Sequence, residues 1–162
     1  MNEAYVSIGT NLGDRAAQLD FALRSLAALP DTRVAALSPV FETDPVGPPP
    51  QGAYLNAVVH VETALAPRAL LEALLAIERA AGRERGERNA ARTLDLDLLL
   101  YGDRIVDEPG LTVPHPRLAE RAFILEPLAA LAPGLMHPGL GEPIGSLAAR
   151  VRDPRAVRVW AR

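Results

Sequence analysis

Two aspartates stand two positions apart in a segment that otherwise has the composition of a buried β-strand, TLDLDLLLYGD, Thr93 to Asp103. Side chains alternate between the two faces of a strand, so Asp95 and Asp97 are expected on one face. The opposite face would then carry four leucines, Leu94, Leu96, Leu98 and Leu100. Two ionised carboxylates beside so much leucine are costly unless positive charge meets them, which makes this pair a candidate for chemistry.

The aspartate pair is suited to binding divalent metal ions. Aspartate oxygens are hard ligands, which Mg²⁺ prefers together with phosphate oxygens and water. Residues on one face of a strand lie about 7 Å apart at their backbones, and paired metals lie about 3.5 to 4 Å apart, so two carboxylates leaning together could hold such a pair. A strand at a sheet edge, with its polar face in water, would explain the same pattern.

An arginine-rich segment directly precedes the aspartates. The segment GRERGERNAAR, residues 82–92, is expected to be a loop that carries four guanidinium groups, those of Arg83, Arg85, Arg88 and Arg92. A polyphosphate with its own divalent metals would match both features, because metals bind carboxylates and arginine forks bind phosphate oxygens. A solvated loop in which Glu84 and Glu87 pair with the arginines explains the segment equally well.

A second group of residues could recognise a flat ring. Tyr54 and Asn56 lie on one strand, and His115, Arg121 and Phe123 follow in the segment LTVPHPRLAERAFIL. An asparagine amide flanked by aromatic rings could hydrogen-bond the edge of a heterocycle stacked between them. Each of these residues, taken singly, also fits core packing or another structural role.

Composition excludes several classes of protein. All 17 basic side chains are arginine, and the missing lysine excludes a Walker A loop, a kinase strand lysine and a lysine Schiff base. Without cysteine there is no disulfide framework, thiolate nucleophile or cysteine-based zinc site. A net charge of -3 does not favour nucleic acid, and the chain has neither a membrane-length apolar run nor a secretory signal. We therefore expect a cytoplasmic protein that binds no nucleic acid and no membrane.

The elements that must position these residues follow from hydrophobic periodicity. Strand patterns cover residues 4–8, 34–41, 54–63, the aspartate segment and 157–160, and helical patterns cover residues 14–29, 67–81, 123–131 and 146–150. The order β-α-β-β-α-β is that of the ferredoxin-like split βαβ arrangement. We expect one α+β domain over residues 1–162, with an antiparallel sheet, helices packed on it and extra C-terminal helical segments. No exposed apolar seam is evident, so a monomer is expected.

The assembled motifs resemble the 6-hydroxymethyl-7,8-dihydropterin pyrophosphokinase family of folate biosynthesis. The matching segments are YVSIGTNLGDR, ETDPVGP followed by YLNAVV, IERAAGRERGER, RTLDLDLLLYG and LTVPHPRLAERAFILEPLAALAP. The resemblance implies that a pyrophosphoryl group moves from ATP to the hydroxymethyl oxygen of the pterin and that AMP is released. It also implies two Mg²⁺ ions as cofactors, with ATP and the pterin as the partners of the protein.

The resemblance also implies roles for individual residues. Asp95 and Asp97 match the metal ligands, and we expect Arg83 and Arg92 to supply positive charge to the transition state. The residues expected to contact ATP are Glu78, Arg85, Arg88, Leu98, Thr112, His115 and Arg121. The residues expected to bind the pterin are Thr43, Pro45, Val46, Tyr54, Asn56 and Phe123.

Other function classes share parts of this pattern. A split βαβ domain can bind RNA, but the strand LDLDLLLY is acidic where RNA would lie. A metal-dependent nuclease, a nucleotide-sugar transferase or another Mg-dependent DxD enzyme of nucleotidyl or phosphoryl transfer could use the same aspartates and arginines. None of these enzymes accounts for the proline- and glycine-rich loop beside Tyr54, Asn56 and Phe123.

Overall fold

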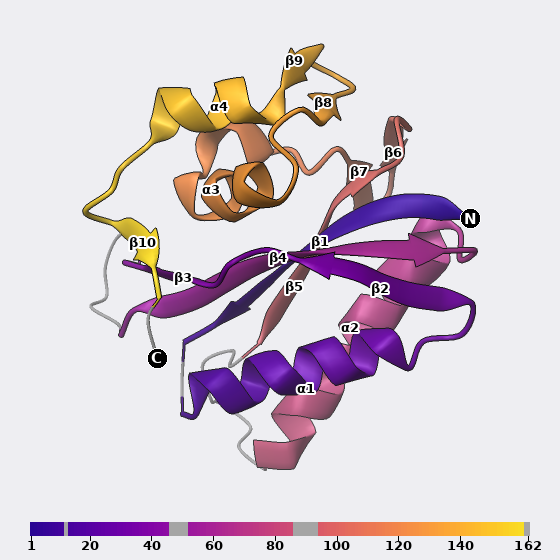
Figure 1. Cartoon of the computed structure of the whole chain (residues 1–162). Helices are drawn as coiled ribbons and strands as arrows, with labels where there is room; N and C mark the ends of the chain where they lie inside the picture. The colour runs from indigo at the N-terminus through magenta and orange to yellow at the C-terminus, as the bar shows by residue number, and fades with distance from the viewer. Residues whose placement is uncertain (12, 46–51, 86–93, 161–162) are drawn as a thin grey trace.

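A six-stranded antiparallel sheet forms the centre of the molecule (Figure 1). The computed structural model describes residues 1–11, 13–45, 52–85 and 94–160, with residues 83–85 described by their backbone alone. The sheet is built from β1 (Asn2–Thr10), β2 (Thr32–Leu37), β3 (Phe41–Thr43), β4 (Tyr54–Thr63), β5 (Asp95–Tyr101) and β10 (Val157–Val159). Its order is β10-β3-β4-β1-β5, and β2 pairs with β4 farther along the same edge as β3. The predicted α+β fold with an antiparallel sheet is confirmed.

Helices cover both faces of the sheet (Figure 1). The helices α1 (Arg15–Ala27) and α2 (Pro67–Arg85) lie on one face, and α3 (Ala122–Leu131) and α4 (Ile144–Val151) lie on the other. The remaining elements are β6 (Val106–Glu108), β7 (Leu111–Val113), a 3-10 turn (Leu118–Glu120), β8 (Met136–His137) and β9 (Glu142–Pro143). Among the described residues, no helix combines the length and apolar character needed to cross a bilayer.

Alternation along the strands divides the apolar residues between two cores. The core under α1 and α2 contains Ala4, Val6 and Ile8 of β1, and the core under α3 and α4 contains Tyr5 of the same strand. Beyond Tyr5 the second face of β1 continues with Ser7 and Gly9, which are small. The end of the sheet that these residues reach is therefore left open for a site.

The strand expected over residues 34–41 is wrong as a single element. The structure breaks it at Ser38 into β2 and β3, both of which pair with β4. Pro39 has no backbone N–H to donate to a ladder. The Ser38 hydroxyl accepts a hydrogen bond from the Val58 N–H at 2.9 Å, and the Ser38 N–H donates to the Val58 carbonyl at the same distance. These two bonds satisfy the β4 backbone across the break.

The expected faces of β5 are correct up to Leu99 and wrong for Leu100 and Tyr101. Between the pairs Val6–Leu98 and Tyr5–Leu100 the register shifts by one residue, which is a β-bulge at Leu99. Leu99 and Leu100 therefore both enter the core under α3 and α4, and Tyr101 enters the core under α1 and α2. Asp95 and Asp97 precede the bulge, so their shared face is unaffected.

Helix α2 extends four residues beyond the predicted end at Ala81. It ends at Arg85, so the loop expected from Gly82 is wrong for residues 82–85. Glutamate and arginine are good helix formers, and cations are favourable in the last turn of a helix. These preferences outweigh the cost of the single glycine in this turn.

Candidate active site

A cavity of about 760 Å³ lies between the open end of the sheet, the start of α3 and the C-terminal segment. Nine of the residues singled out from the sequence line it: Thr43, Pro45, Tyr54, Asn56, Glu78, Asp95, Asp97, Arg121 and Phe123. A volume of this size is typical of pockets for drug-sized ligands and cofactors. The structure thus brings residues from distant parts of the sequence into one cavity.

One row across three strands organises the cavity floor. Gly9 of β1 lies directly opposite Asn56 of β4 on one side and Asp95 of β5 on the other. Directly paired residues share a face, and neighbouring strands are about 4.8 Å apart, so Asn56 and Asp95 lie about 10 Å apart at their backbones. The next row along this face carries Ser7 opposite Asp97. The amide and the two carboxylates therefore point into the same space.

The amide end of the row forms a buried polar wall. The Asn56 Nδ2 donates a hydrogen bond to the Thr43 Oγ1 at 2.6 Å, and both side chains are buried. Because the Thr43 hydroxyl accepts this bond, its own proton is available to a ligand. A Cβ added to Gly9 would lie 2.9 Å from the Asn56 Oδ1, so only glycine leaves room for this amide.

The carboxylate end of the row is supported from helix α2. The Glu78 Oε2 accepts a hydrogen bond from the backbone N–H of Leu96 at 2.8 Å, midway between the two aspartates. Burial raises the pKa of the Tyr54 phenol, and the nearby Asp95 carboxylate raises it further. The Asp95 carboxylate therefore acts electrostatically on the Tyr54 side chain, which lies at the Asn56 end of the cavity.

The opposite wall comes from the segment that enters α3. Arg121 is the N-terminal cap residue of α3, and its guanidinium carbon lies 5.5 Å from the centre of the Phe123 ring. A cation at this distance over an aromatic face is attracted by the ring. Arg117 lines the same wall and was not singled out from the sequence.

His115 does not line the cavity, although it is near Asp97 and Arg121. Burial lowers its pKa, the Asp97 carboxylate opposes this effect, and the charges of Arg121 and Arg117 add to it. The His115 Nδ1 accepts a hydrogen bond from the Arg117 N–H at 3.2 Å. The neutral ring therefore carries its proton on Nε2.

The remaining expected site residues lie elsewhere or outside the described ranges. The Leu98 side chain is buried in the core under α1 and α2, and Thr112 is exposed on β7. Arg83 and Arg85 lie on the last turn of α2. Val46, Arg88 and Arg92 lie outside the described residues.

Several cavity residues were missed by the sequence analysis. They are Ser7, Gly9, Asp44, Arg117, Glu120, Ala122, Ile124, Val151, Asp153, Ala156 and Val157. Gly9 lies in the motif YVSIGTN and so could have been noticed, but no sequence pattern marks Asp153 or its neighbours. Among the described lining residues, six carboxylates face two guanidinium groups, which favours a ligand that brings positive charge.

Comparison with known proteins agrees with these features. The family model of 7,8-dihydro-6-hydroxymethylpterin-pyrophosphokinase matches residues 5–133. The 2-amino-4-hydroxy-6-hydroxymethyldihydropteridine pyrophosphokinase of Pseudomonas aeruginosa is 46% identical over 138 residues, which are 85% of each chain. The protein of the same name from Bacillus subtilis is 38% identical over 159 residues, covering 98% of this chain and 90% of that one.

Solved structures show the same fold at lower identity. The crystal structure of wild-type Plasmodium falciparum HPPK-DHPS with SDX-DHP superposes with a TM-score of 0.71 at 16% identity. The match covers 93% of this chain and 43% of that chain. The family resemblance inferred from the sequence motifs is confirmed: the chain belongs to the 7,8-dihydro-6-hydroxymethylpterin pyrophosphokinase family.

Proposed function

We propose that this protein transfers the terminal diphosphoryl group of ATP to the hydroxymethyl oxygen of 6-hydroxymethyl-7,8-dihydropterin. The hydroxyl oxygen forms a bond to the β-phosphorus, the bond from that phosphorus to the α,β-bridging oxygen breaks, and AMP leaves with the bridging oxygen. The observation that carries the proposal is the row Asn56–Gly9–Asp95. This row supports a ring at one end and phosphates at the other, about two strand spacings apart.

The ring would bind at the Asn56 end of the cavity. Asn56 and Thr43 offer an amide and a hydroxyl to the hydrogen-bonding edge of the pterin, and Tyr54 and Phe123 offer apolar faces to its ring. Because the amide is buried, a ring that lacked matching donors and acceptors would leave it unsatisfied. Pro45 lines the same region, and Val46 stays a prediction of the sequence.

Asp95 and Asp97 would hold the Mg²⁺ ions. Within the described ranges no three histidine, cysteine, aspartate or glutamate side chains form a metal-binding group. Asp95 and Asp97 share one face of β5 and line the cavity, which supports Mg²⁺, because this ion usually takes one or two carboxylates and completes its shell with phosphate oxygens and water. When bound, the ions would neutralise phosphate charge and acidify the attacking hydroxyl.

The contribution of the chain to catalysis is then mainly positioning and charge. Phosphoryl transfer needs little covalent help from a protein, so orientation of the two substrates supplies much of the rate. Arg121 and Arg117 line the cavity wall, which supports a role for both in binding phosphate oxygens. We further propose that Arg83 and Arg85 at the end of α2, and Arg88 and Arg92 after it, add positive charge, as the family resemblance implies.

Release of AMP from ATP tests the proposal. The parent protein should release AMP only when ATP, the pterin alcohol and Mg²⁺ are all present. Asp95→Asn and Asp97→Asn should each lower the rate at least about a hundredfold if metal binding fails. Asp107→Asn, at an exposed position of β6, is the matched control and should keep the parent rate. AMP release at an equal rate without the pterin would contradict the proposed reaction.

Three finer statements are proposals of the same kind. The strand order supports the ferredoxin-like split arrangement if β2 and β3 are counted as one interrupted strand. We also propose that residues 1–162 form one domain. A cytoplasmic location and a monomeric state stay predictions of the sequence. Other DxD transfer enzymes are not favoured, because the family assignment covers both the aspartate strand and the ring-binding segment.

A further inference from the structure

We propose that Arg158 of the C-terminal strand β10 is a positioning residue for the ring-binding wall. It would act through Glu42 and Asp44, the two neighbours of Thr43 in the chain. The inference rests on the proposed function, because it concerns the part of the cavity that would bind the pterin ring. Arg158 does not itself line the cavity.

The strand that carries Thr43 is short and depends on its neighbours. β3 has three residues, which pair with β4 on one side and with Val157–Val159 of β10 on the other. Two further backbone bonds extend this pairing, from the Asp44 N–H to the Ala156 carbonyl at 2.8 Å and from the Trp160 N–H to the Val40 carbonyl at 2.9 Å. Without β10, β3 would be a three-residue edge strand with a single neighbour.

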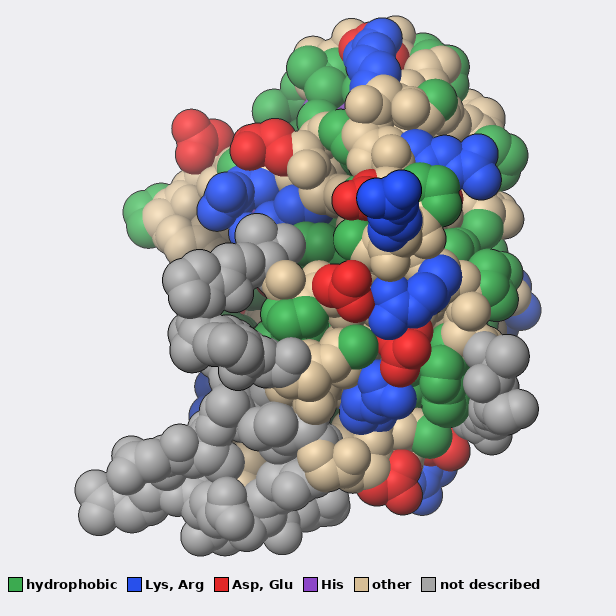
Figure 2. Space-filling view, turned by 90° about the vertical axis from the view of Figure 1, so that its left-hand side faces the viewer, with side chains coloured by type: hydrophobic (Ala, Val, Ile, Leu, Met, Phe, Trp, Pro, Cys, Tyr) green, Lys and Arg blue, Asp and Glu red, His purple; other side chains and the backbone are tan. Residues whose placement is uncertain are grey.

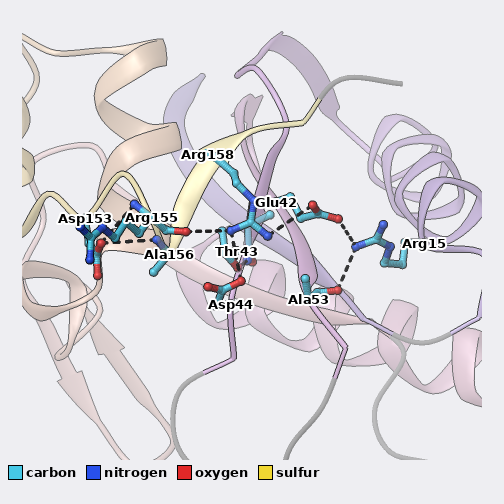
Figure 3. Close-up of polar contacts among 10 residues, drawn as sticks. Arg15, Glu42, Thr43, Asp44, Ala53, Asp153, Arg155, Ala156 and Arg158 are labelled. Carbon is cyan, nitrogen blue, oxygen red and sulfur yellow. Dashed lines mark hydrogen bonds and ion pairs between the residues drawn. The ribbon is translucent and has the colours of Figure 1, made fainter.

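A chain of four charged side chains joins the two strands (Figure 3). Arg158 donates to the Asp44 Oδ1 at 3.1 Å and to the Glu42 Oε1 at 3.4 Å. The other oxygen of Glu42 accepts from Arg15 at 2.8 Å, and Arg15 also donates to the Ala53 carbonyl at 3.0 Å. The charges therefore alternate in sign along the chain, and basic and acidic side chains also alternate over this face of the molecule (Figure 2).

This network is attached to both ends of the segment that follows β3. Asp44 is the first residue after β3, and Ala53 is the last residue before β4. Arg158 forms an ion pair with Asp44, and Arg15 donates a hydrogen bond to the Ala53 carbonyl. Both arginines also form ion pairs with Glu42. The two arginines thus fix where the backbone leaves one strand and enters the next.

The described start of this segment, together with the end of β3, lines the cavity. Thr43, Asp44 and Pro45 line it in succession, and Ala156 and Val157 of the C-terminal segment line it beside them. Glu42 and Thr43 point to opposite faces of β3, so the ion pairs of Glu42 hold the strand from the side away from Thr43, whereas the Asp44 end of the network lies at the cavity. A shift of β3 would change the 2.6 Å contact between Thr43 and Asn56, which is the polar edge offered to the ring.

The test compares Arg158→Gln with Arg150→Gln. Arg150 of α4 forms an ion pair with Glu142 of β9 and does not line the cavity. Each variant loses one positive charge from an ion pair, so the two are matched. KM for the pterin alcohol and KM for ATP are measured by AMP release. Hydrogen exchange of residues 41–44, followed by mass spectrometry or NMR, reports on β3 without any turnover.

For Arg158→Gln we expect KM for the pterin to rise about three- to fivefold, with KM for ATP unchanged and with faster exchange at residues 41–44. Arg150→Gln should match the parent protein in all three measurements. The double variant Arg158→Gln/Asp44→Asn restores the net charge and should keep the raised KM. A return of the double variant to the parent KM, or an unchanged exchange rate in Arg158→Gln, would overturn the positioning role.

Failure of the proposed function would look different. A parent protein that releases no AMP with the pterin alcohol contradicts the reaction and leaves the exchange measurement to decide on Arg158. A parent protein that turns over normally, with equal pterin KM in both variants, contradicts the role of Arg158 alone.

Discussion

Replacement of Gly9 by alanine should weaken binding of the pterin with a limited effect on the free energy of unfolding. Gly9 lies on β1 without a positive φ, so alanine is compatible with the backbone and the effect is steric. The new Cβ would lie 2.9 Å from the Asn56 Oδ1, a distance that real Cβ atoms essentially never show. The Asn56 amide must therefore move, and its bond to the Thr43 hydroxyl at 2.6 Å would lengthen or break.

The size of the effect follows from the buried amide. Leaving a buried polar group imperfectly paired costs about 1 to 3 kcal/mol, so the pterin should bind about ten- to a hundredfold more weakly. Alanine also restricts the unfolded chain, which contributes about 0.4 to 1 kcal/mol in the opposite direction. The free energy of unfolding should therefore fall by no more than about 2.6 kcal/mol.

Calorimetric titration of the pterin alcohol into protein that holds Mg²⁺ and a non-hydrolysable ATP analogue measures the loss. Gly134→Ala is the control, since a Cβ at Gly134 meets nothing within 4 Å. Asn56→Ala should weaken pterin binding as well, and Gly9→Ala on that background should add little, because both changes act on one amide. Fully additive losses, or parent-like pterin affinity in Gly9→Ala, would refute the steric explanation.

Three further predictions concern single carboxylates and a histidine. Glu78→Ala should reduce AMP release and lower the free energy of unfolding by about 1 to 2 kcal/mol, because the Leu96 N–H loses its acceptor; denaturant unfolding measures this. The Arg15 hydrogen bond lowers the pKa of Glu42 from 4.5, so its stabilisation is complete above that pH and is lost as pH falls through the lowered pKa. Glu42→Gln should therefore lower Tm more at pH 7 than at pH 3. Burial lowers the pKa of His115 while Asp97 opposes the shift, so Asp97→Asn should lower that pKa further in an NMR titration.

Much of the fold could be predicted from local pattern. Alternating apolar residues identified β1 and β4, and the position of Pro67 identified the start of α2. The break at Ser38 was missed because the Ser38 hydroxyl replaces a ladder bond to Val58 of β4. The sequence of the segment alone does not identify that partner strand. The face of Leu100 was missed because a β-bulge depends on pairing with β1 and leaves no mark in the alternation of β5.

The candidate site likewise has residues that the local sequence identifies and residues whose role depends on distant partners. Spacing drew attention to the aspartates, and the aromatic residues stood out because they could stack on a ring beside an asparagine amide. Gly9 contributes by having no side chain, and this is visible only when Asn56 lies beside it. The contact of Asp44 with Arg158 joins residues 114 positions apart, a separation at which no local pattern operates.

The bulge at Leu99 allows the two halves of β5 to present their side chains to different faces of the sheet. The first half must present carboxylates to the cavity, and the second half must turn Tyr101 inward, where the phenol donates to the Leu65 carbonyl. A chain shortened by this one leucine would restore simple alternation and still keep both halves on their present sides. An extra residue between Asp95 and Asp97 would instead turn one of the carboxylates toward the apolar interior, so tolerance to length change in β5 should depend sharply on where the change falls.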